Sequence, residues 1–273
     1  MMLKLTLRAP SSIPLEVEGI TPERVAGLSP LEVAKLPVQH GNRAEPLGEF
    51  FEVIHDPKGT WADLHIAGDT SNVKFIGARM SAGNIYVENR VGMHAGAQMS
   101  GGSLTLDSGA AGWLGAEMRG GSIEVRGHAG DHVGAAYRGS RRGMTGGTIV
   151  VRGSAGDELG LLMRRGLIVA EGACGQFAGA SMIAGTLALF GTVGERCGAG
   201  MKRGTILTAT APQLPPSFRF ACEYRPSFLP LYLAHFARLG VNLPTGFGVG
   251  TLRCFRGDML TGGKGEVLIG GGT

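Results

Sequence analysis

The sequence is poor in several features on which common protein classes depend. Aromatic residues make up 6% of the 273 residues, and the four cysteines include no C-x-x-C pair. The cysteine spacing therefore excludes a zinc ribbon or a redox dithiol. The sequence has no N-x-S/T sequon, no apolar leader at its N-terminus, and no run approaching the ~18 apolar residues of a membrane span. We therefore predict a cytoplasmic protein with free thiols and no membrane partner.

What the sequence has in excess is glycine, at 48 of 273 residues, more than double the usual ~7%. Aligned on glycine, residues 72–211 divide into seven units, of which the fourth has 26 residues and the others 19. The sixth and twelfth places are glycine in every unit, and the ninth is methionine except for Tyr137 in the fourth. Such columns establish an internal repeat. The units are 72–90, 91–109, 110–128, 129–154, 155–173, 174–192 and 193–211.

Within each unit, apolar residues alternate with a period of two. Places 5, 7 and 9 read I-A-M in the first unit, and places 14 and 16 are apolar almost throughout, from Ile85 and Val87 to Ile206 and Thr208. This alternation indicates two short strands per unit, each with one buried face, and a more irregular third side. Units stacked ~4.8 Å apart can bury faces that one unit cannot. We therefore predict a mainly β protein, a right-handed parallel β-helix of seven 19-residue coils with small α/β caps at both ends.

The two glycine columns are predicted to shape the main chain. The twelfth-place glycine precedes a strand, so we expect a corner with positive φ there. The sixth-place glycine falls between inward residues, which favours a bend. A flattened outer face for a docking partner is the alternative.

The repeat is flanked by segments that we expect to cover its ends, because a bare terminal coil is an open sheet edge. Residues 1–49 are predicted to form an N-terminal α/β cap, in which Ser29 starts a helix with a capping box. Residues 50–211 then form the β-helix domain. Residues 212–273 form a C-terminal extension with a rigid linker, a helix over 227–239, and strands.

Short motifs that would place chemistry on the chain are missing. The segment 246–250 lacks the G-x-G-x-x-G of a dinucleotide-binding turn, and 257–264 misses the phosphate-loop spacing by one residue. His128 and His132 fall in neighbouring units, and His94 lies two units from His132, too far for one metal. Neither G-x-S-x-G nor H-E-x-x-H occurs. We therefore predict no catalytic residue and no metal ligand on this chain.

Basic residues gather on the later units, where residues 119–203 carry eleven basic and six acidic groups. They recur at two places, so stacked coils would hold them ~5 Å apart, with a repulsion of roughly 0.8 kcal/mol per neighbouring pair in water. A solvated face, a protein interface and nucleic-acid binding are alternatives, the last disfavoured by the scarcity of aromatics. We predict a track that binds a polyanion. Its residues are Arg119, Arg138, Arg164 and Lys202 at the tenth place, Arg165 and Arg203 at the eleventh, and Arg141 and Arg142 in the insertion of the fourth unit.

Parts of the sequence resemble known families. The strand ends GGSIEVRG (120–127) and GGTIVVRG (146–153) make the repeat resemble the glycine-rich β-helix domain of glutamate synthase. The segments on either side of the repeat point to a more specific family, because they are similar to the C subunit of the formylmethanofuran dehydrogenase family. They read ITPERVAGLSPLEVAKLPVQHGNRAEPLGEFFEV (20–53) and GDMLTGGKGEVLIGG (257–271). This second resemblance covers almost the entire chain.

The resemblance implies a structural subunit whose catalytic partners are other chains. Two complexes use such a subunit. One is the molybdenum or tungsten formylmethanofuran dehydrogenase of methanogens. The other is the formyltransferase/hydrolase complex of methylotrophic bacteria, which converts formyl-tetrahydromethanopterin through a formyl-furan cofactor to formate.

Composition favours the bacterial complex, because arginine exceeds lysine by 20 to 6 and alanine and glycine are abundant. Methanofuran-type cofactors carry a glutamate-containing tail, so the resemblance implies that the basic track binds such a cofactor by its tail. On the residues alone, a stand-alone β-helix binding protein is a further alternative.

Overall fold

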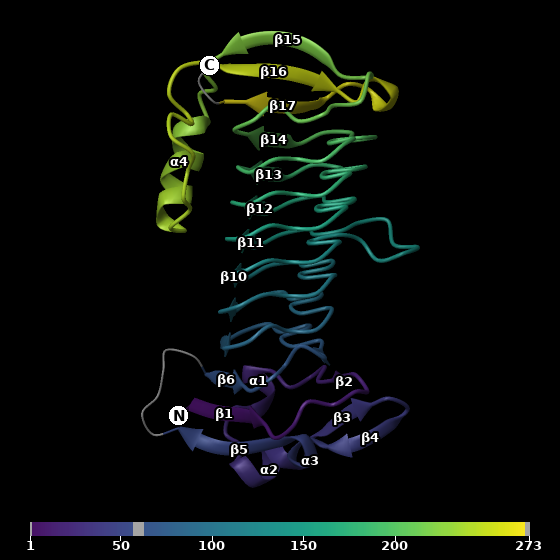
Figure 1. Cartoon of the computed structure of the whole chain (residues 1–273), viewed down its shortest axis with the longest axis vertical. Coiled ribbons are helices and arrows are strands. Elements are labelled where there is room, and N and C mark those ends of the chain that lie inside the picture. Colours follow the sequence, from purple (N-terminus) through teal and green to yellow (C-terminus); the bar gives the residue numbers. More distant parts are fainter. Residues whose placement is uncertain (1, 57–62, 271–273) are drawn as a thin grey trace.

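The computed structural model describes residues 2–56 and 63–270. Its regular structure is mostly β, and one sheet of thirteen strands runs along the molecule (Figure 1). The strand order is β15-β16-β17-β14-β13-β12-β11-β10-β9-β8-β6-β1-β5. The prediction of a mainly β protein is therefore confirmed, with a large parallel sheet at its centre.

The repeat builds the middle of this sheet. Each unit contributes one four-residue strand, and neighbouring strands pair in parallel with equivalent places opposite each other, as Ile123 pairs with Ile149. The strands are β8 (Asn84–Val87), β9 (Ser103–Leu106), β10 (Ser122–Val125), β11 (Thr148–Val151), β12 (Leu167–Ala170), β13 (Thr186–Leu189) and β14 (Thr205–Thr208).

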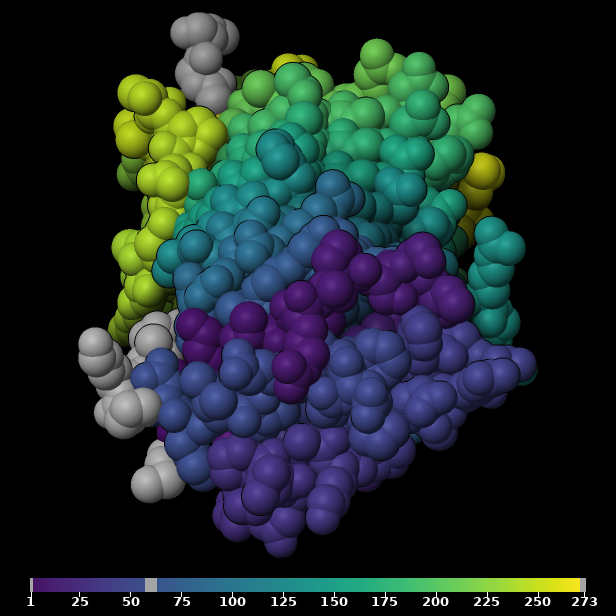
Figure 2. All heavy atoms as spheres, turned by 60° about the horizontal axis from the view of Figure 1, so that its bottom comes forward, coloured from purple at the N-terminus to yellow at the C-terminus, as the bar shows by residue number. Residues whose placement is uncertain are grey.

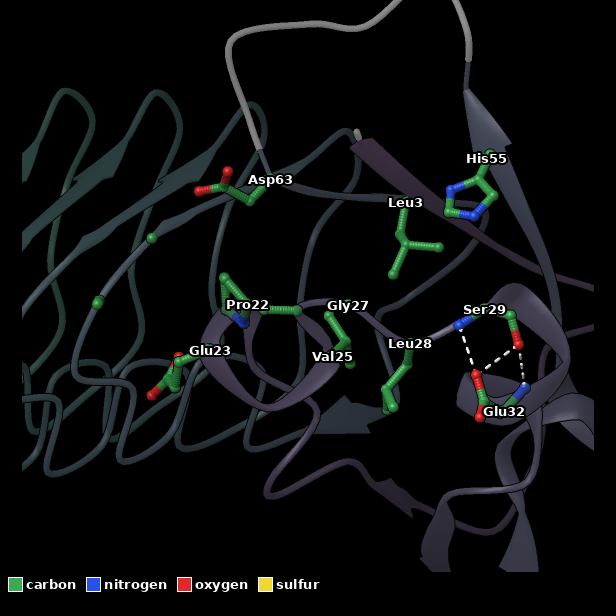
Figure 3. A pocket seen from close by; sticks show the side chains of 13 residues that line it. Leu3, Pro22, Glu23, Val25, Gly27, Leu28, Ser29, Glu32, His55 and Asp63 are labelled. Atoms are coloured by element: carbon green, nitrogen blue, oxygen red, sulfur yellow. Dashed lines mark hydrogen bonds between the residues drawn. The ribbon is translucent and has the colours of Figure 1, made fainter.

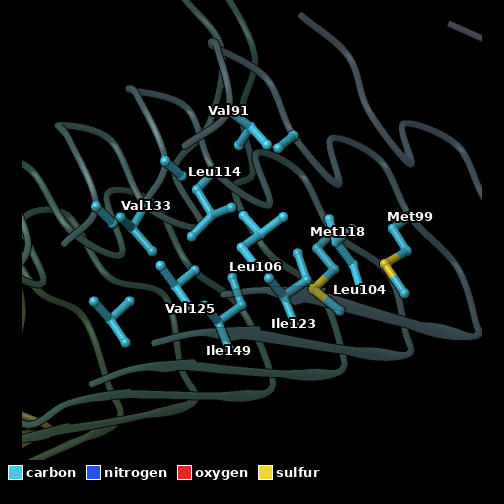
Figure 4. Packing of buried hydrophobic residues seen from close by; sticks show 14 of the residues in the cluster. Val91, Met99, Leu104, Leu106, Leu114, Met118, Ile123, Val125, Val133 and Ile149 are labelled. Atoms are coloured by element: carbon cyan, nitrogen blue, oxygen red, sulfur yellow. The ribbon is translucent and has the colours of Figure 1, made fainter. Parts of the chain in front are cut away.

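The main core lies behind these strands. Side chains at places 14 and 16 are at most 1% exposed in every unit, which confirms the predicted burial. Figure 4 shows Leu104, Ile123 and Ile149 following one another along the stack, with Met99 and Met118 beside them. Burying one such side chain contributes ~1.5–3 kcal/mol. The in-register aliphatic stack is therefore a main source of stability.

The second strand predicted in each unit, over places 5 to 9, is wrong. This stretch is a turn in which residues other than glycine also have positive φ, such as 53° at Glu117, and the preceding Trp113, at the fourth place, has a φ of 66°. Main-chain bonds to both neighbouring units hold it, from Trp113 N–H to Asp131 O and from Gly115 N–H to Ala95 O (2.8 Å each). Because the chain turns at every second residue, the place-7 alanine of the first three units leaves the main core for an outer cluster under aromatic rings.

Both glycine columns have positive φ in all seven units, so the predicted corner and bend are confirmed. At the twelfth place, a Cβ on Gly121 would lie 2.7 Å from the carbonyl oxygen of Gly102 in the preceding unit. At the sixth place, a Cβ on Gly115 would lie 2.5 Å from Cδ1 of Ile149. The sixth-place glycine therefore faces the core and not an outer docking surface.

The N-terminal segment covers one end of the repeat (Figure 2). In the predicted capping box, Ser29 N–H donates to Glu32 Oε2 at 2.8 Å and Glu32 N–H donates to Ser29 Oγ at 3.3 Å. Strand β1 (Met2–Leu7) pairs in parallel with β6 (Leu64–Ala67) and antiparallel with β5 (Phe51–Asp56). The other elements are α1 (Pro22–Val25), α2 (Pro30–Ala34), α3 (Leu47–Phe50) and a small sheet of β2 (Leu15–Glu16), β3 (Pro37–His40), β4 (Arg43–Pro46) and β7 (Val73–Lys74).

The C-terminal segment covers the outer face of the sheet over the later units. Helix α4 (Leu229–Arg238), expected at 227–239, packs there, and Phe236 meets Phe190 edge to face at 5.6 Å. The outward fifteenth place switches at this boundary from Glu124 in β10 to Val150 in β11. The remaining elements are β15 (Arg219–Tyr224), β16 (Leu252–Gly257), η1 (Met259–Thr261) and β17 (Gly265–Ile269), which extends the large sheet beside β14.

Arg152 joins helix α4 to the sheet. Its guanidinium pairs with Glu124 at 2.7 Å and with Glu171 at 2.6 Å. It also donates to the main-chain oxygens of Leu239 and Gly240, at 2.6 Å each, where the helix ends. A cation at a helix C-terminus is favourable. Since the side chain is only 19% exposed, these contacts are largely shielded from water.

Replacing Gly121 with alanine tests whether the corner excludes a Cβ. We expect the free energy of unfolding in urea to fall by about 1–3 kcal/mol, because the new Cβ meets main chain and positive φ disfavours it. Gly246→Ala is the matched control, because its φ is 79° and no atom lies within 4 Å of the added Cβ. Equal losses in the two variants would contradict the crowding argument.

Replacing Arg152 with glutamine should lower the free energy of unfolding by about 2–3 kcal/mol, because two carboxylates and two main-chain oxygens lose a charged donor. Arg126 occupies the same place one unit earlier but pairs with Asp107 at a position that is 54% exposed. Arg126→Gln should therefore change stability by less than about 1 kcal/mol. Thermal and urea unfolding of both variants provide the measurement. A similar loss of stability in both would contradict the role of Arg152 in holding helix α4 to the sheet.

Candidate functional site

The predicted basic track does not form one column. Met144, fully buried, occupies the ninth place of the fourth unit, and Tyr137 does not. Thr145 N–H then donates to Met118 O at 2.7 Å, as Arg119 N–H does to Met99 O one unit earlier. Thr145 therefore takes the tenth place that was predicted for Arg138. The seven inserted residues, 137–143, lie outside the repeat, and Arg138, Arg141 and Arg142 lie on that loop.

The remaining cations alternate with uncharged residues along the stack. Arg119 lies in the third unit, Arg164 in the fifth and Lys202 in the seventh, with Thr145 and Ile183 in the units between. At two unit spacings, ~9.6 Å, the repulsion in water falls to roughly 0.4 kcal/mol per pair. The predicted close contact of charges in neighbouring coils is therefore wrong.

Four of the predicted residues line one cavity of about 750 Å³. The fifth unit supplies Arg164 and Arg165, and the seventh supplies Lys202 and Arg203. The sixth unit lies between them with small or apolar residues. We call this site the basic cavity. Its described lining residues are Arg164, Arg165, Gly166, Ile183, Ala184, Gly185, Thr186, Lys202, Arg203, Tyr232, Thr261, Gly262 and Lys264.

The C-terminal segment completes the cavity with residues that the sequence did not single out. Lys264 adds a fifth cation, and Tyr232 from α4 shares a 2.7 Å hydrogen bond with the Thr186 hydroxyl. The Thr261 hydroxyl donates to Met201 O at 2.6 Å. In the sequence, the segment containing Lys264 stands out as an imperfect phosphate-loop motif and as part of the C-terminal flank that carries the family resemblance. No sequence signal connects it to the repeat, because the contact arises when β16 and β17 fold back onto β14.

Positive charge dominates the basic cavity. None of its described lining residues is acidic, and its five cations form no ion pair with any described residue. All five side chains are exposed. The site can therefore accept several carboxylates or phosphates without first breaking internal salt bridges, and the arginine fork matches the geometry of both groups.

The insertion loop is fixed at its base by a ladder of rings at the fourth place of the early units. His94 stacks on Phe75 at 4.6 Å, and Trp113 stacks on His132 at 4.1 Å. The Tyr137 hydroxyl lies 3.0 Å from His94 Nδ1, and the Tyr137 ring stacks on Trp113 at 5.0 Å. Burial raises the pKa of Tyr137 to about 12, with Glu117 as a further cause. The tyrosine therefore stays neutral and can donate to His94.

A second pocket, of about 670 Å³, lies between the N-terminal segment and the first unit (Figure 3). Its carboxylates already have partners. Glu32 closes the capping box, Glu23 accepts from Ser81 N–H at 2.8 Å, and Asp63 accepts from Asn84 N–H at 2.7 Å. These carboxylates therefore have structural roles. They are less available to a ligand than the cations of the basic cavity.

Other classes of site find little support within residues 2–56 and 63–270. No group of three or more His, Cys, Asp or Glu is arranged there to hold a metal ion. No helix in this part of the chain is long and apolar enough to cross a membrane. The cysteines are unpaired, and burial raises the pKa of Cys174 and of Cys197 to about 12, so neither is an activated thiol.

The ring ladder predicts a pH dependence of stability. Burial lowers the pKa of His94, and the charge of Lys74 lowers it further. The unfolded chain therefore binds this proton more readily, so stability is complete above ~6.5 and falls as pH drops through that value. We expect the Tm of the wild type to fall more than that of His94→Gln between about pH 7.5 and about pH 5.5. Parallel pH profiles for the two proteins would contradict this assignment.

Comparison with known proteins places these observations in a family. No protein-family model matches the chain. The C subunit of the tungsten-containing formylmethanofuran dehydrogenase 2 of Methanothermobacter thermautotrophicus is 40% identical over 92 residues, 33% of this chain and 34% of the relative. The C subunit of the molybdenum-containing formylmethanofuran dehydrogenase 1 of Methanosarcina barkeri is 44% identical over 84 residues, 30% of this chain and 28% of the relative. These matches span about a third of the length of the curated relatives.

The formyltransferase/hydrolase complex gives a sequence match of similar length and a structural match over nearly the whole chain. Its C subunit from Methylorubrum extorquens is 38% identical over 89 residues, 32% of each chain. A chain in the crystal structure of that complex with methylofuran superposes with a TM-score of 0.89 and 36% identity, covering 97% of this chain and 98% of that one. The predicted resemblance is thereby confirmed. The protein belongs to the family formed by the C subunits of formylmethanofuran dehydrogenases and of the formyltransferase/hydrolase complex.

Proposed function

We propose that this chain is the structural C subunit of a formyltransferase/hydrolase complex. Such a complex converts formyl-tetrahydromethanopterin, through a formyl-methanofuran-type cofactor, to formate. The observation that carries the proposal is the match over 97% of the chain to a chain of the formyltransferase/hydrolase complex. The matches to dehydrogenase subunits support the alternative, the C subunit of a molybdenum or tungsten formylmethanofuran dehydrogenase, but extend over only about a third of the chain.

In this proposal the chain is a scaffold and the other subunits of the complex carry out the reactions in the cytoplasm. Catalysis by acid and base needs paired titratable groups with matched pKa values near a bound substrate. The basic cavity instead presents three arginines, two lysines and three hydroxyls. These groups suit binding of an anion, and a stand-alone binding protein would share this chemistry without co-purifying catalytic chains.

The scaffold itself is proposed to be a right-handed parallel β-helix over 50–211, between an N-terminal cap over 1–49 and a C-terminal extension over 212–273. Three features of every inner unit support winding of this kind. Each unit has one parallel strand, one hydrogen-bonded turn and one parallel bridge at its first place, as between Ala110 and Ala129. The strand, the turn and the bridge each join a unit to both of its neighbours by main-chain hydrogen bonds, which is the arrangement expected of stacked coils.

The basic cavity is proposed to hold the glutamate tail of a methanofuran-type cofactor. A concave site that converges several donors favours a small flexible ligand over a broad surface. Side-chain carboxylates along a peptide-like tail repeat every few ångströms, so successive groups can reach cations in the fifth and seventh units. The structure of the related complex contains methylofuran, a furan cofactor, which supports the ligand class. Arg119 occupies the same tenth place as Arg164, two units earlier in the stack, and can extend the site.

Replacing Arg164, Arg165 and Arg203 with glutamine should strip the cofactor from the complex while leaving it assembled. Loss of about 1 kcal/mol per exposed contact corresponds to roughly 100-fold weaker retention. The complex is purified from its native host through a tag on this chain, its chains are identified, and the cofactor is quantified by mass spectrometry.

The matched control replaces Arg43, Arg90 and Arg219 with glutamine, which removes the same charge at exposed positions that do not line the cavity. This control should retain the cofactor. Retention in the cavity variant would refute the tail site, whereas recovery of molybdenum or tungsten dehydrogenase chains would favour the alternative complex.

A further inference from the structure

The insertion of the fourth unit forms a loop that projects sideways from the stack, as Figure 1 shows near residue 140. The other six units have 19 residues. The loop, residues 137–143, reads YRGSRRG and carries Arg138, Arg141 and Arg142. All three arginine side chains are exposed, and none forms an ion pair with a described residue. The loop therefore carries three unneutralised charges into solvent.

Contacts at both ends and within the loop hold it in place. Tyr137 fixes its start, through the His94 contact and a bond from its N–H to Glu117 Oε1 at 3.3 Å. Gly143 fixes its end, donating from N–H to Leu162 O at 2.9 Å. Inside the loop, Ser140 N–H donates to Tyr137 O at 2.9 Å. A loop held at both ends loses little conformational freedom when it binds, which strengthens binding.

The shape of the loop distinguishes its ligand from that of the basic cavity. A small flexible anion binds best in a concave site that surrounds it. The loop is the reverse, a convex projection with three exposed charges, and such a shape suits a recess on another macromolecule better than a small anion. The loop itself offers no base-stacking platform, because Tyr137 is held against the ring ladder, and this disfavours nucleic acid.

We propose that residues 137–143 form a docking element that inserts into an acidic recess on another protein subunit of the complex. This inference rests on the proposed function, which supplies the partner subunits. Arginine forks pair with carboxylates of the recess in two-pronged contacts. Because such contacts are charge-complementary, they guide association and set its orientation. The loop and the basic cavity thus have separate ligands, although both were predicted to belong to one track.

Three variants with equal charge loss separate the two roles in the purified complex. Replacing Arg138, Arg141 and Arg142 with glutamine should weaken association with one catalytic subunit by roughly tenfold or more, with the cofactor content of the remaining assembled complex unchanged. The variant with Arg164, Arg165 and Arg203 replaced should lose the cofactor and keep all its subunits. The control at Arg43, Arg90 and Arg219 should match wild type. Raising salt should weaken assembly of wild type more than of the loop variant.

A shortened chain tests the loop independently of charge. Deleting residues 137–143 leaves a unit of 19 residues with Met144 at the ninth place, so it should fold with the circular dichroism of wild type and still lose the same subunit. A photo-crosslinking amino acid in place of Ser140 should join the wild-type loop to a segment of that subunit rich in Asp and Glu. Full assembly of either variant, loss of cofactor without loss of a subunit, or crosslinks confined to this chain would overturn the proposal.

Discussion

The spacing between neighbouring units is the constraint on which the rest of this structure depends. Main-chain hydrogen bonds hold equivalent strands ~4.8 Å apart, and at that distance Gly102 O leaves no room for a Cβ on Gly121. The same spacing brings Ile123 against Ile149 and closes the core. Any residue at a given place therefore lies next to its equivalents. Repetition in the sequence becomes columns in space, of aliphatic side chains inside, glycine at the corners and aromatic rings outside.

Burial along β8–β14 could be predicted because period-two alternation in a strand reports directly which face is covered. The same pattern failed over places 5 to 9. Ala116 and Met118 are both fully buried, but the alanine packs under the outer rings and the methionine in the main core. Burial alone therefore cannot distinguish a strand from a turn in which every second residue has positive φ. Positive φ at Trp113 disfavours that residue by roughly 1–2 kcal/mol, which stacking and inter-unit hydrogen bonds offset.

The candidate site could be predicted only in part, for two reasons. Alignment on Gly134 and Gly147 leaves the position of the insertion open, and so places Arg138 in the repeat. A signal is present, because Met144 lies three residues before its glycine, as Met118 does before Gly121. Tyr232 and Lys264 have no such signal. Their place at the cavity depends on how α4 packs on the sheet and how β17 extends it, which are contacts between segments far apart in the sequence.

Because packing fixes the inward places, the units can differ only at outward places and in insertions. The fifteenth place becomes apolar where α4 covers the sheet, and the fourth place carries rings where the insertion loop is anchored. The tenth place carries cations in alternate units, where repulsion between them is halved relative to neighbouring units. Residues at these outward places can therefore differ between units without a change at the inward places. A repeat of this kind suits a subunit that presents separate binding surfaces at fixed distances, because one surface can change without disturbing the column that supports it.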